Sequence, residues 1–94
     1  MNATIRTSVN AYGFGRDWTL VVTNGEQTKN FYLGQDVKFC SRVLCMSPAY
    51  VVEQIGSSDM SNPDTLDRLG NLILDALELD ESVFEAESWE LCCQ

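Results

Sequence analysis

The dipeptide Asn24-Gly25 is the feature that most constrains the fold of this chain. It stands between "WTLVVT" (residues 18–23) and "EQTKNFYL" (residues 26–33), two runs rich in β-branched and aromatic residues. A two-residue type I′ turn needs positive φ at both central residues, and Asn-Gly meets that need well. The two runs are therefore predicted to pair as a β-hairpin, with Phe31 and Leu33 turned toward a core.

A third strand is expected before the hairpin. Ile5, Thr7 and Val9 alternate with polar residues, which is the period-2 pattern of a half-buried strand. The run "GFGRD" (residues 13–17) follows as a loop, since its glycines adopt positive φ at little cost. The pattern predicts a three-stranded antiparallel β-meander over about residues 3–33.

Residues 35–79 carry the signals of three helices. Residues 35–46 repeat apolar side chains at helical spacing. Ser47-Pro48 and Asn62-Pro63 each place an N-cap residue before a proline, a common start of a helix, and Gly56 is a natural end for the second helix. The third helix carries a broad apolar stripe made of Leu66, Leu69, Leu72, Ile73, Ala76 and Leu77.

The last fifteen residues leave two structures open. Asp80 can begin a short helix in which Val83 and Phe84 face inward. Alternatively, "SWELCC" (residues 88–93) can add a strand to the edge of the sheet. Either way, the apolar side chains in this segment argue against a disordered tail.

These signals together predict an α+β fold in which a three-stranded antiparallel sheet packs against three helices. Ninety-four residues suit one domain with one small core. We expect a single domain, residues 1–94, made of a β-meander (1–33), a helical part (35–79) and an acidic C-terminal segment (80–94).

The net charge of −8 is concentrated in one part of the chain. Residues 1–58 hold four acids and five bases, whereas residues 59–94 hold ten acids and Arg68 as their single base. Such asymmetry favours a surface directed at a partner, with a solvated acidic face as the alternative. It also disfavours direct binding to nucleic acid, because phosphates require Lys and Arg.

Carboxylates held in fixed places on a folded surface imitate the phosphate charges of nucleic acid. A partner groove lined with Lys and Arg would attract them and associate faster because of that attraction. The candidate partner-binding residues are Asp64, Asp67, Asp75, Glu78, Asp80, Glu81, Glu85, Glu87 and Glu90.

The composition disfavours catalysis, metals and cofactors. The chain has no His, the commonest general base, and no phosphate-binding or calcium-binding loop motif. Its four cysteines, Cys40, Cys45, Cys92 and Cys93, lack the spacing of a structural zinc site. We therefore expect a protein without catalytic residues, metal or cofactor, and keep a thiol or metal protein as a further alternative.

No membrane segment is expected. No stretch approaches the roughly 18 consecutive apolar residues of a membrane-spanning helix. The N-terminus, "MNATIRTSVNAYG", lacks the apolar region of a secretory signal. The expected location is the cytoplasm of a bacterial host cell.

Residues 35–56 resemble the helix-turn-helix of small phage-type repressors. The residues that carry the resemblance are Leu44, Cys45 (where that family has Gly), Met46, Ser47, Tyr50 and Val51. A recognition helix usually offers Arg, Lys, Asn or Gln to DNA, but here the second helix carries Glu53 and only Gln54 suits a base. A regulator derived from a helix-turn-helix, acting on DNA or on a protein, is the alternative function.

In size, acidity, lack of His and absence of a catalytic motif, the whole chain resembles the small inhibitors that phages and mobile elements encode against bacterial defence, such as anti-CRISPR proteins. Several of these are similar to nucleic acid in charge and occupy the DNA- or RNA-binding channel of a Cas effector. The resemblance implies a non-enzymatic inhibitor whose partner is a basic protein surface, such as that of a nucleic-acid-binding effector complex.

Overall fold

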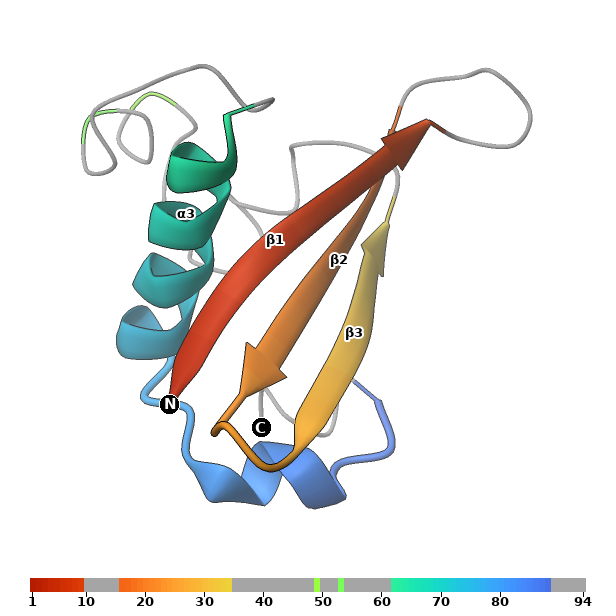
Figure 1. Ribbon diagram of the computed structural model, residues 1–94, viewed down its shortest axis with the longest axis vertical. Helices are drawn as coiled ribbons and strands as arrows, with labels where there is room; N and C mark the ends of the chain where they lie inside the picture. The colour runs from red at the N-terminus through yellow and green to blue at the C-terminus, as the bar shows by residue number, and fades with distance from the viewer. Residues whose placement is uncertain (10–15, 35–48, 50–52, 54–61, 89–94) are drawn as a thin grey trace.

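The computed structural model describes residues 1–9, 16–34, 49, 53 and 62–88. These residues form a three-stranded sheet, one α-helix and a short 3₁₀ helix, an α+β arrangement (Figure 1). The elements are β1 (Asn2–Val9), β2 (Arg16–Thr23), β3 (Thr28–Gly34), α3 (Pro63–Ala76) and η1 (Glu81–Glu85). Two of the three predicted helices, over residues 35–46 and 48–56, fall outside the described residues apart from Ala49 and Glu53.

The predicted β-meander is confirmed. The strands lie in the order β1-β2-β3, and both neighbouring pairs are antiparallel. Ile5 lies opposite Leu20, which in turn lies opposite Phe31, so one apolar row crosses the sheet. The register between β2 and β3 shifts once, between Trp18 and Thr19.

The turn of the hairpin differs from the predicted type I′ turn on Asn24-Gly25. The Asn24 N–H donates to the carbonyl of Gln27 (3.2 Å), so Gly25 and Glu26 are the central residues. Of these two residues, Gly25 has positive φ (94°) and Glu26 does not. The Asn24 side chain explains why the turn is centred one residue later than predicted. Its oxygen accepts hydrogen bonds from the N–H groups of Glu26 (2.9 Å) and Gln27 (2.8 Å) and so stabilises the loop.

The core lies between one face of the sheet, α3 and η1. It contains Phe31 and Leu33, as predicted, and Ile5 is buried as the alternation in β1 requires. The prediction that alternate residues of β1 are buried is wrong at Val9. This residue is 68% exposed, because the core ends before the end of β1. The buried cluster consists of Ala3, Ile5, Trp18, Leu20, Val22, Phe31, Leu33, Leu69, Ile73, Leu74 and Val83.

Helix α3 begins where its cap predicts. The Asn62 side chain accepts a hydrogen bond from the N–H of Asp64 (2.9 Å), and Pro63 occupies the first helical position. Leu69 and Ile73 are fully buried, as predicted. The other residues of the predicted stripe differ in burial. Leu66, Leu72 and Leu77 are partly buried, while Ala76 is exposed. The helix also buries three residues outside that stripe: Thr65, Gly70 and Leu74.

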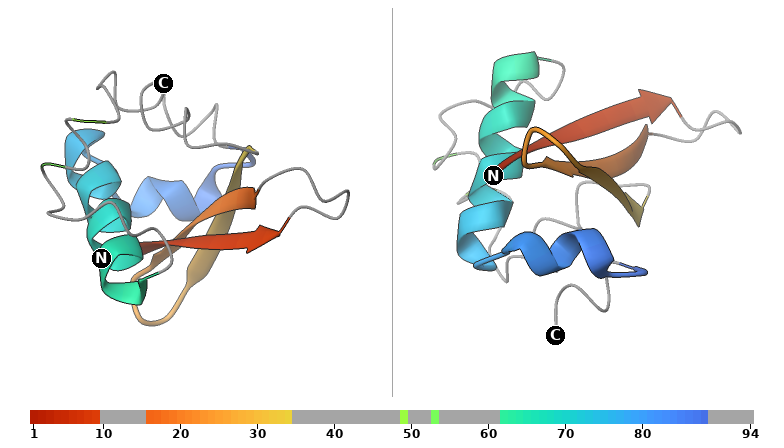
Figure 2. Two further views of the ribbon diagram at one scale, coloured as in Figure 1. Left: turned by 90° about the horizontal axis from the view of Figure 1, so that it is seen from above. Right: turned by 60° about the horizontal axis from the view of Figure 1, so that its bottom comes forward.

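The C-terminal segment begins as a short helix, in agreement with one of the two alternatives. Asp80 caps η1, Val83 is buried and Phe84 packs against the core. Figure 2 shows η1 turning away from the end of α3 and crossing under the sheet. The alternative strand begins at Ser88, and its remaining residues lie outside the described part. None of the helices in the described residues is long and apolar enough to cross a membrane.

Thr65 provides the first prediction. Its side chain is fully buried, and its hydroxyl has no hydrogen-bond partner within the described part of the chain. Because a buried unpaired hydroxyl costs about 1–3 kcal/mol, Thr65→Val should raise the free energy of unfolding by about 1 kcal/mol in urea denaturation. Thr65→Ser, which keeps the hydroxyl and loses the methyl group, should lower that free energy. A valine variant less stable than the natural protein would contradict this account.

Candidate partner-binding surface

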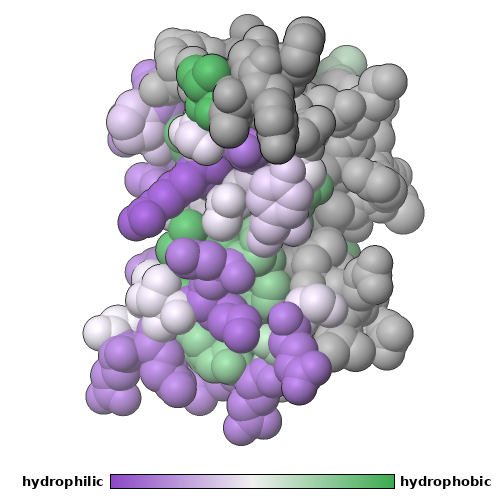
Figure 3. All heavy atoms as spheres, turned by 90° about the vertical axis from the view of Figure 1, so that its right-hand side faces the viewer, coloured by the Kyte–Doolittle hydropathy of each residue, from purple (hydrophilic) through white to green (hydrophobic). Residues whose placement is uncertain are grey.

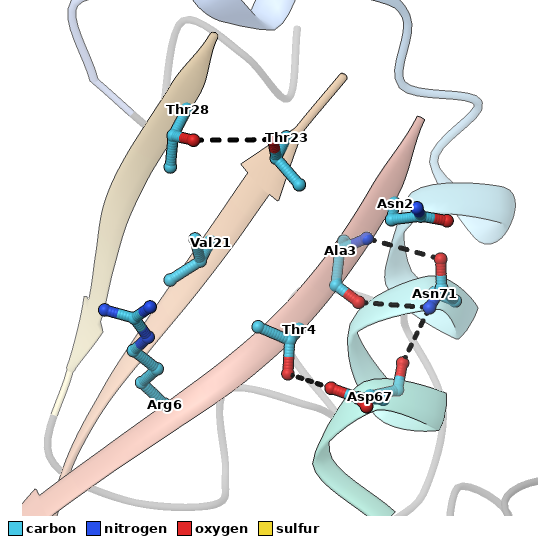
Figure 4. Close-up of a pocket in the computed structure, with 9 residues that line it drawn as sticks. All are labelled: Asn2, Ala3, Thr4, Arg6, Val21, Thr23, Thr28, Asp67 and Asn71. Carbon is cyan, nitrogen blue, oxygen red and sulfur yellow. Dashed lines mark hydrogen bonds between the residues drawn. The ribbon is translucent and has the colours of Figure 1, made fainter. Parts of the chain in front are cut away.

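Three of the predicted acidic residues lie on the outer face of α3. Asp64, Asp67 and Asp75 are all exposed, and the apolar residues of the helix face the core. With 3.6 residues per turn and a rise of about 1.5 Å per residue, these three side chains share one side of the helix over about 17 Å. Asp67 also has a structural contact, because its carboxylate accepts a hydrogen bond from the Thr4 hydroxyl (2.6 Å; Figure 4).

Glu78 follows Leu77, the C-cap of α3, in a position that ordinarily suits glycine. Its φ is 50°, in the left-handed region that costs a residue with a side chain about 1–2 kcal/mol. The Leu79 N–H donates to the Leu74 carbonyl (3.0 Å) and the Glu78 N–H to the Asp75 carbonyl (3.2 Å), which is the Schellman pattern. The helix therefore ends in a glycine-type cap built with a glutamate.

The acids at this end of α3 also oppose the helix dipole. The C-terminal end of a helix carries a partial negative charge and favours cations. Asp75 stands in the last turn, Glu78 follows it, and the last turn holds no basic residue. Neither backbone conformation nor the helix dipole accounts for carboxylates at these two positions.

A second prediction follows from Glu78. Glu78→Gly should raise the free energy of unfolding by about 1 kcal/mol, because it removes both the left-handed strain and a charge next to the helix end. Glu78→Ala removes the charge and keeps the strain, so it is the matched control. Thermal or urea denaturation of both variants checks this. Equal stabilities of the glycine and alanine variants would show that the strain is absent.

Asp80 is fixed as the N-cap of η1. Its carboxylate accepts from the N–H of Ser82 (2.9 Å). Hydrogen bonds from the side chain and then the backbone of Ser82 lower the pKa of Asp80 below its ordinary value of 3.8. This carboxylate is therefore ionised at neutral pH, and it is held in place rather than free to turn.

The remaining candidates continue the acidic surface along η1. Glu81, Glu85 and Glu87 are exposed, while Glu90 lies outside the described residues. In Figure 3, hydrophilic side chains gather at the lower end of the molecule, where η1 and the β2–β3 loop lie in Figure 1. The structure thus brings Asp75, Glu78 and the η1 acids to one end of the molecule, and places Asp64 farther along α3. We call the eight candidate acids that the structure describes the acidic surface: Asp64, Asp67, Asp75, Glu78, Asp80, Glu81, Glu85 and Glu87.

The structure also contains a hollow that the sequence interpretation missed. It has a volume of about 480 Å³ and lies on the sheet face opposite the core, beside α3 (Figure 4). Val21 forms an apolar floor, and Thr4, Arg6 and Asn71 stand around it. The available signal was the set of outward-facing positions of β1 and β2, which carry β-branched Thr and Val where a purely solvated face would carry charged residues.

No metal centre is found in the part of the chain that the structure describes: no group of three His, Cys, Asp or Glu side chains is placed to hold an ion. The four cysteines, and hence the thiol alternative, lie outside those residues, as does nearly all of the helix-turn-helix-like segment. Comparison with protein-family models, curated proteins and solved structures gave no match for this chain.

Proposed function

We propose that this chain is a small non-enzymatic binding protein that presents its acidic surface to a basic surface on a partner protein. The observation that carries the proposal is the placement of Asp75 and Glu78. Both stand at the negative end of α3, and Glu78 adopts a left-handed backbone conformation. Local physics disfavours acids at both positions, and an interaction with a partner would account for them.

The burial of the neighbouring residues supports the same proposal. Val83 is fully buried and Leu79 packs against the core, so the acids between and beside them are attached to a folded surface. The backbone that carries these acids is therefore already ordered, and binding does not have to fold this segment. An anionic surface on an ordered backbone can compete with a nucleic acid for a channel lined with Lys and Arg.

The expected partner is a nucleic-acid-binding protein of a bacterial cell, such as a Cas effector. Attraction between exposed charges reaches over a Debye length of about 8 Å at physiological ionic strength. Complementary charge mainly raises the association rate, and salt reduces this effect. An inhibitor of this kind needs no catalytic group, because occupying the channel is sufficient.

The test is a pull-down with the tagged full chain from bacterial lysate at about 100 mM and about 500 mM salt, with captured proteins identified by mass spectrometry. The proposal predicts a nucleic-acid-binding protein that is retained at low salt, lost at high salt and displaced by added DNA. Capture that persists at high salt and resists DNA would contradict the proposal. So would the absence of any basic protein at either salt.

A further inference from the structure

The hydrogen bonds of β1 show, through the alternation of antiparallel pairs, which residues of β3 direct their backbone groups away from the sheet. The Ala3 N–H donates to the Asn71 side-chain oxygen (3.3 Å), and the Ala3 carbonyl accepts from the Asn71 amide (3.1 Å). The peptide groups of Ala3 therefore point away from β2. Since antiparallel pairs alternate, Val22, opposite Ala3, directs its N–H and carbonyl toward Lys29 in β3.

The same alternation directs every second residue of β3 outward. Lys29 and Phe31 bond to β2, so Thr28, Asn30 and Tyr32 turn their N–H and carbonyl groups away from the sheet. All three residues are exposed, Tyr32 to 60%. Among the described residues, no hydrogen bond reaches the backbone N–H or carbonyl of these three residues.

The two edge strands of the sheet, β1 and β3, therefore differ in what lies beside them. At β1, α3 packs alongside the strand and Asn71 pairs with its backbone (Figures 1 and 4). No described element lies beyond β3 at the other edge, and Figure 3 views the molecule from that side. A row of unpaired backbone groups on an exposed edge is a template for pairing with another strand.

We infer that the outer edge of β3 pairs with β3 of a second copy of this chain, forming a continuous six-stranded sheet across a two-fold axis. The axis passes at Asn30, so that Asn30 faces its own equivalent and Thr28 faces Tyr32 of the second copy. This register uses all three outward residues and forms about six backbone hydrogen bonds. It goes beyond the proposed function and does not depend on it.

The charges of β3 suit pairing with a second copy. The three outward residues are uncharged, and Lys29 is the only charged residue of β3, so the two-fold register sets no like charges of the two strands directly opposite one another. A lysine on an edge strand often opposes pairing. Here the two-fold register places Lys29 opposite Phe31 of the second copy, and Lys29 already lies 6.0 Å from the Phe31 ring within one chain.

The acids of α3 stay away from this interface, because α3 lies beside β1, at the opposite edge of the sheet. The short helix η1 contacts β3 itself, so its acids lie closer to the interface. An antiparallel two-fold arrangement sends the two copies of η1 to opposite ends of the dimer. The remaining repulsion acts between two chains of net charge −8, and salt screens it.

The dimer is tested by analytical ultracentrifugation of the full chain at several protein concentrations, at about 100 mM and about 500 mM salt. The dimer fraction should rise with protein concentration and be larger at high salt, whereas partner binding weakens with salt. Asn30→Pro removes the central outward N–H without removing a bond to β2, so it should give a monomer with an unchanged far-UV spectrum. Asn30→Ala keeps that N–H and should dimerise.

Amide hydrogen exchange tests the same inference without a variant. The amides of Thr28, Asn30 and Tyr32 should become protected at high protein concentration, whereas those of Lys29 and Phe31 should be protected at all concentrations. A chain that remains monomeric throughout would overturn the inference, as would unchanged exchange of the three outward amides. Protection of these amides only when a captured basic protein is added would assign the edge to that partner instead.

Discussion

Gly70→Ala should lower the free energy of unfolding by about 3 kcal/mol, the largest effect expected from a single methyl group in this chain. Gly70 lies where α3 crosses closest to β1. A Cβ atom at this position would lie 2.5 Å from the Thr4 nitrogen and 2.6 Å from the Ala3 carbonyl carbon, and closer still to the Thr4 Cα. These are backbone atoms, so no side chain can move aside, and the helix and the strand must separate.

The helix propensity of alanine acts in the opposite direction. Alanine is favoured over glycine in a helix interior by about 1 kcal/mol, so a loss of stability in the alanine variant measures the steric conflict after that gain. Ala76→Gly, at an exposed position of the same helix, is the matched control and should cost no more than about 1 kcal/mol. Urea denaturation provides both values. A Gly70→Ala variant as stable as the natural protein would show that α3 does not approach β1 this closely.

Asn71→Ala should lower the free energy of unfolding by about 2 kcal/mol, the second largest effect. The Asn71 side chain accepts from the Ala3 N–H (3.3 Å) and donates to the carbonyls of Ala3 (3.1 Å) and Asp67 (2.9 Å). Both hydrogen bonds with Ala3 are partly buried. Removing the amide leaves the edge of β1 without its partner, and water cannot fully replace it.

The control for this variant is Asn30→Ala. Asn30 is exposed, and its side chain makes no hydrogen bond to the described residues, so under monomeric conditions the change should stay within about 0.5 kcal/mol. The two variants remove the same amide group from different environments. Equal and small effects of the two substitutions would contradict the role of Asn71 in covering the edge of β1.

The elements with strong local signals were predictable from the sequence. Apolar and β-branched residues alternate in the strands, and Asn62-Pro63 marks the start of α3, so both were located correctly. Asp80 also marked the possible start of a short helix, which the structure contains as η1, although the sequence left an edge strand over residues 88–93 open as the alternative. The exposure of Asp64, Asp67, Asp75 and Glu78 followed from their spacing against the apolar stripe of α3.

The contacts between distant parts of the chain were not predictable. From the sequence alone, Gly70 is a residue that destabilises a helix. Its role becomes clear only in the structure, where the backbone of β1 lies against it. Asn71 resembles an ordinary exposed polar residue, although it bonds to Ala3, which is 68 residues away in sequence. The turn shifted by one residue because the Asn24 side chain offered the loop its own hydrogen bonds, a local competition that the Asn-Gly pattern does not reveal.

The central claim is that the position of the acids, and not merely the net charge, produces binding. Two variants of equal charge separate these explanations. One carries Glu78→Gln, Glu81→Gln and Glu85→Gln; the other carries Asn2→Lys, Ser8→Lys and Ala49→Lys at exposed positions outside the acidic surface. Both have a net charge of −5, compared with −8 for the natural chain.

The most direct measurement is the affinity of these two variants for the captured partner at about 100 mM salt. Our account predicts that the glutamine variant binds at least about tenfold more weakly than the natural chain, while the lysine variant binds within about twofold of it. Equal losses in the two variants would show that only net charge matters. An unchanged affinity of the glutamine variant would show that the partner does not contact this end of the acidic surface.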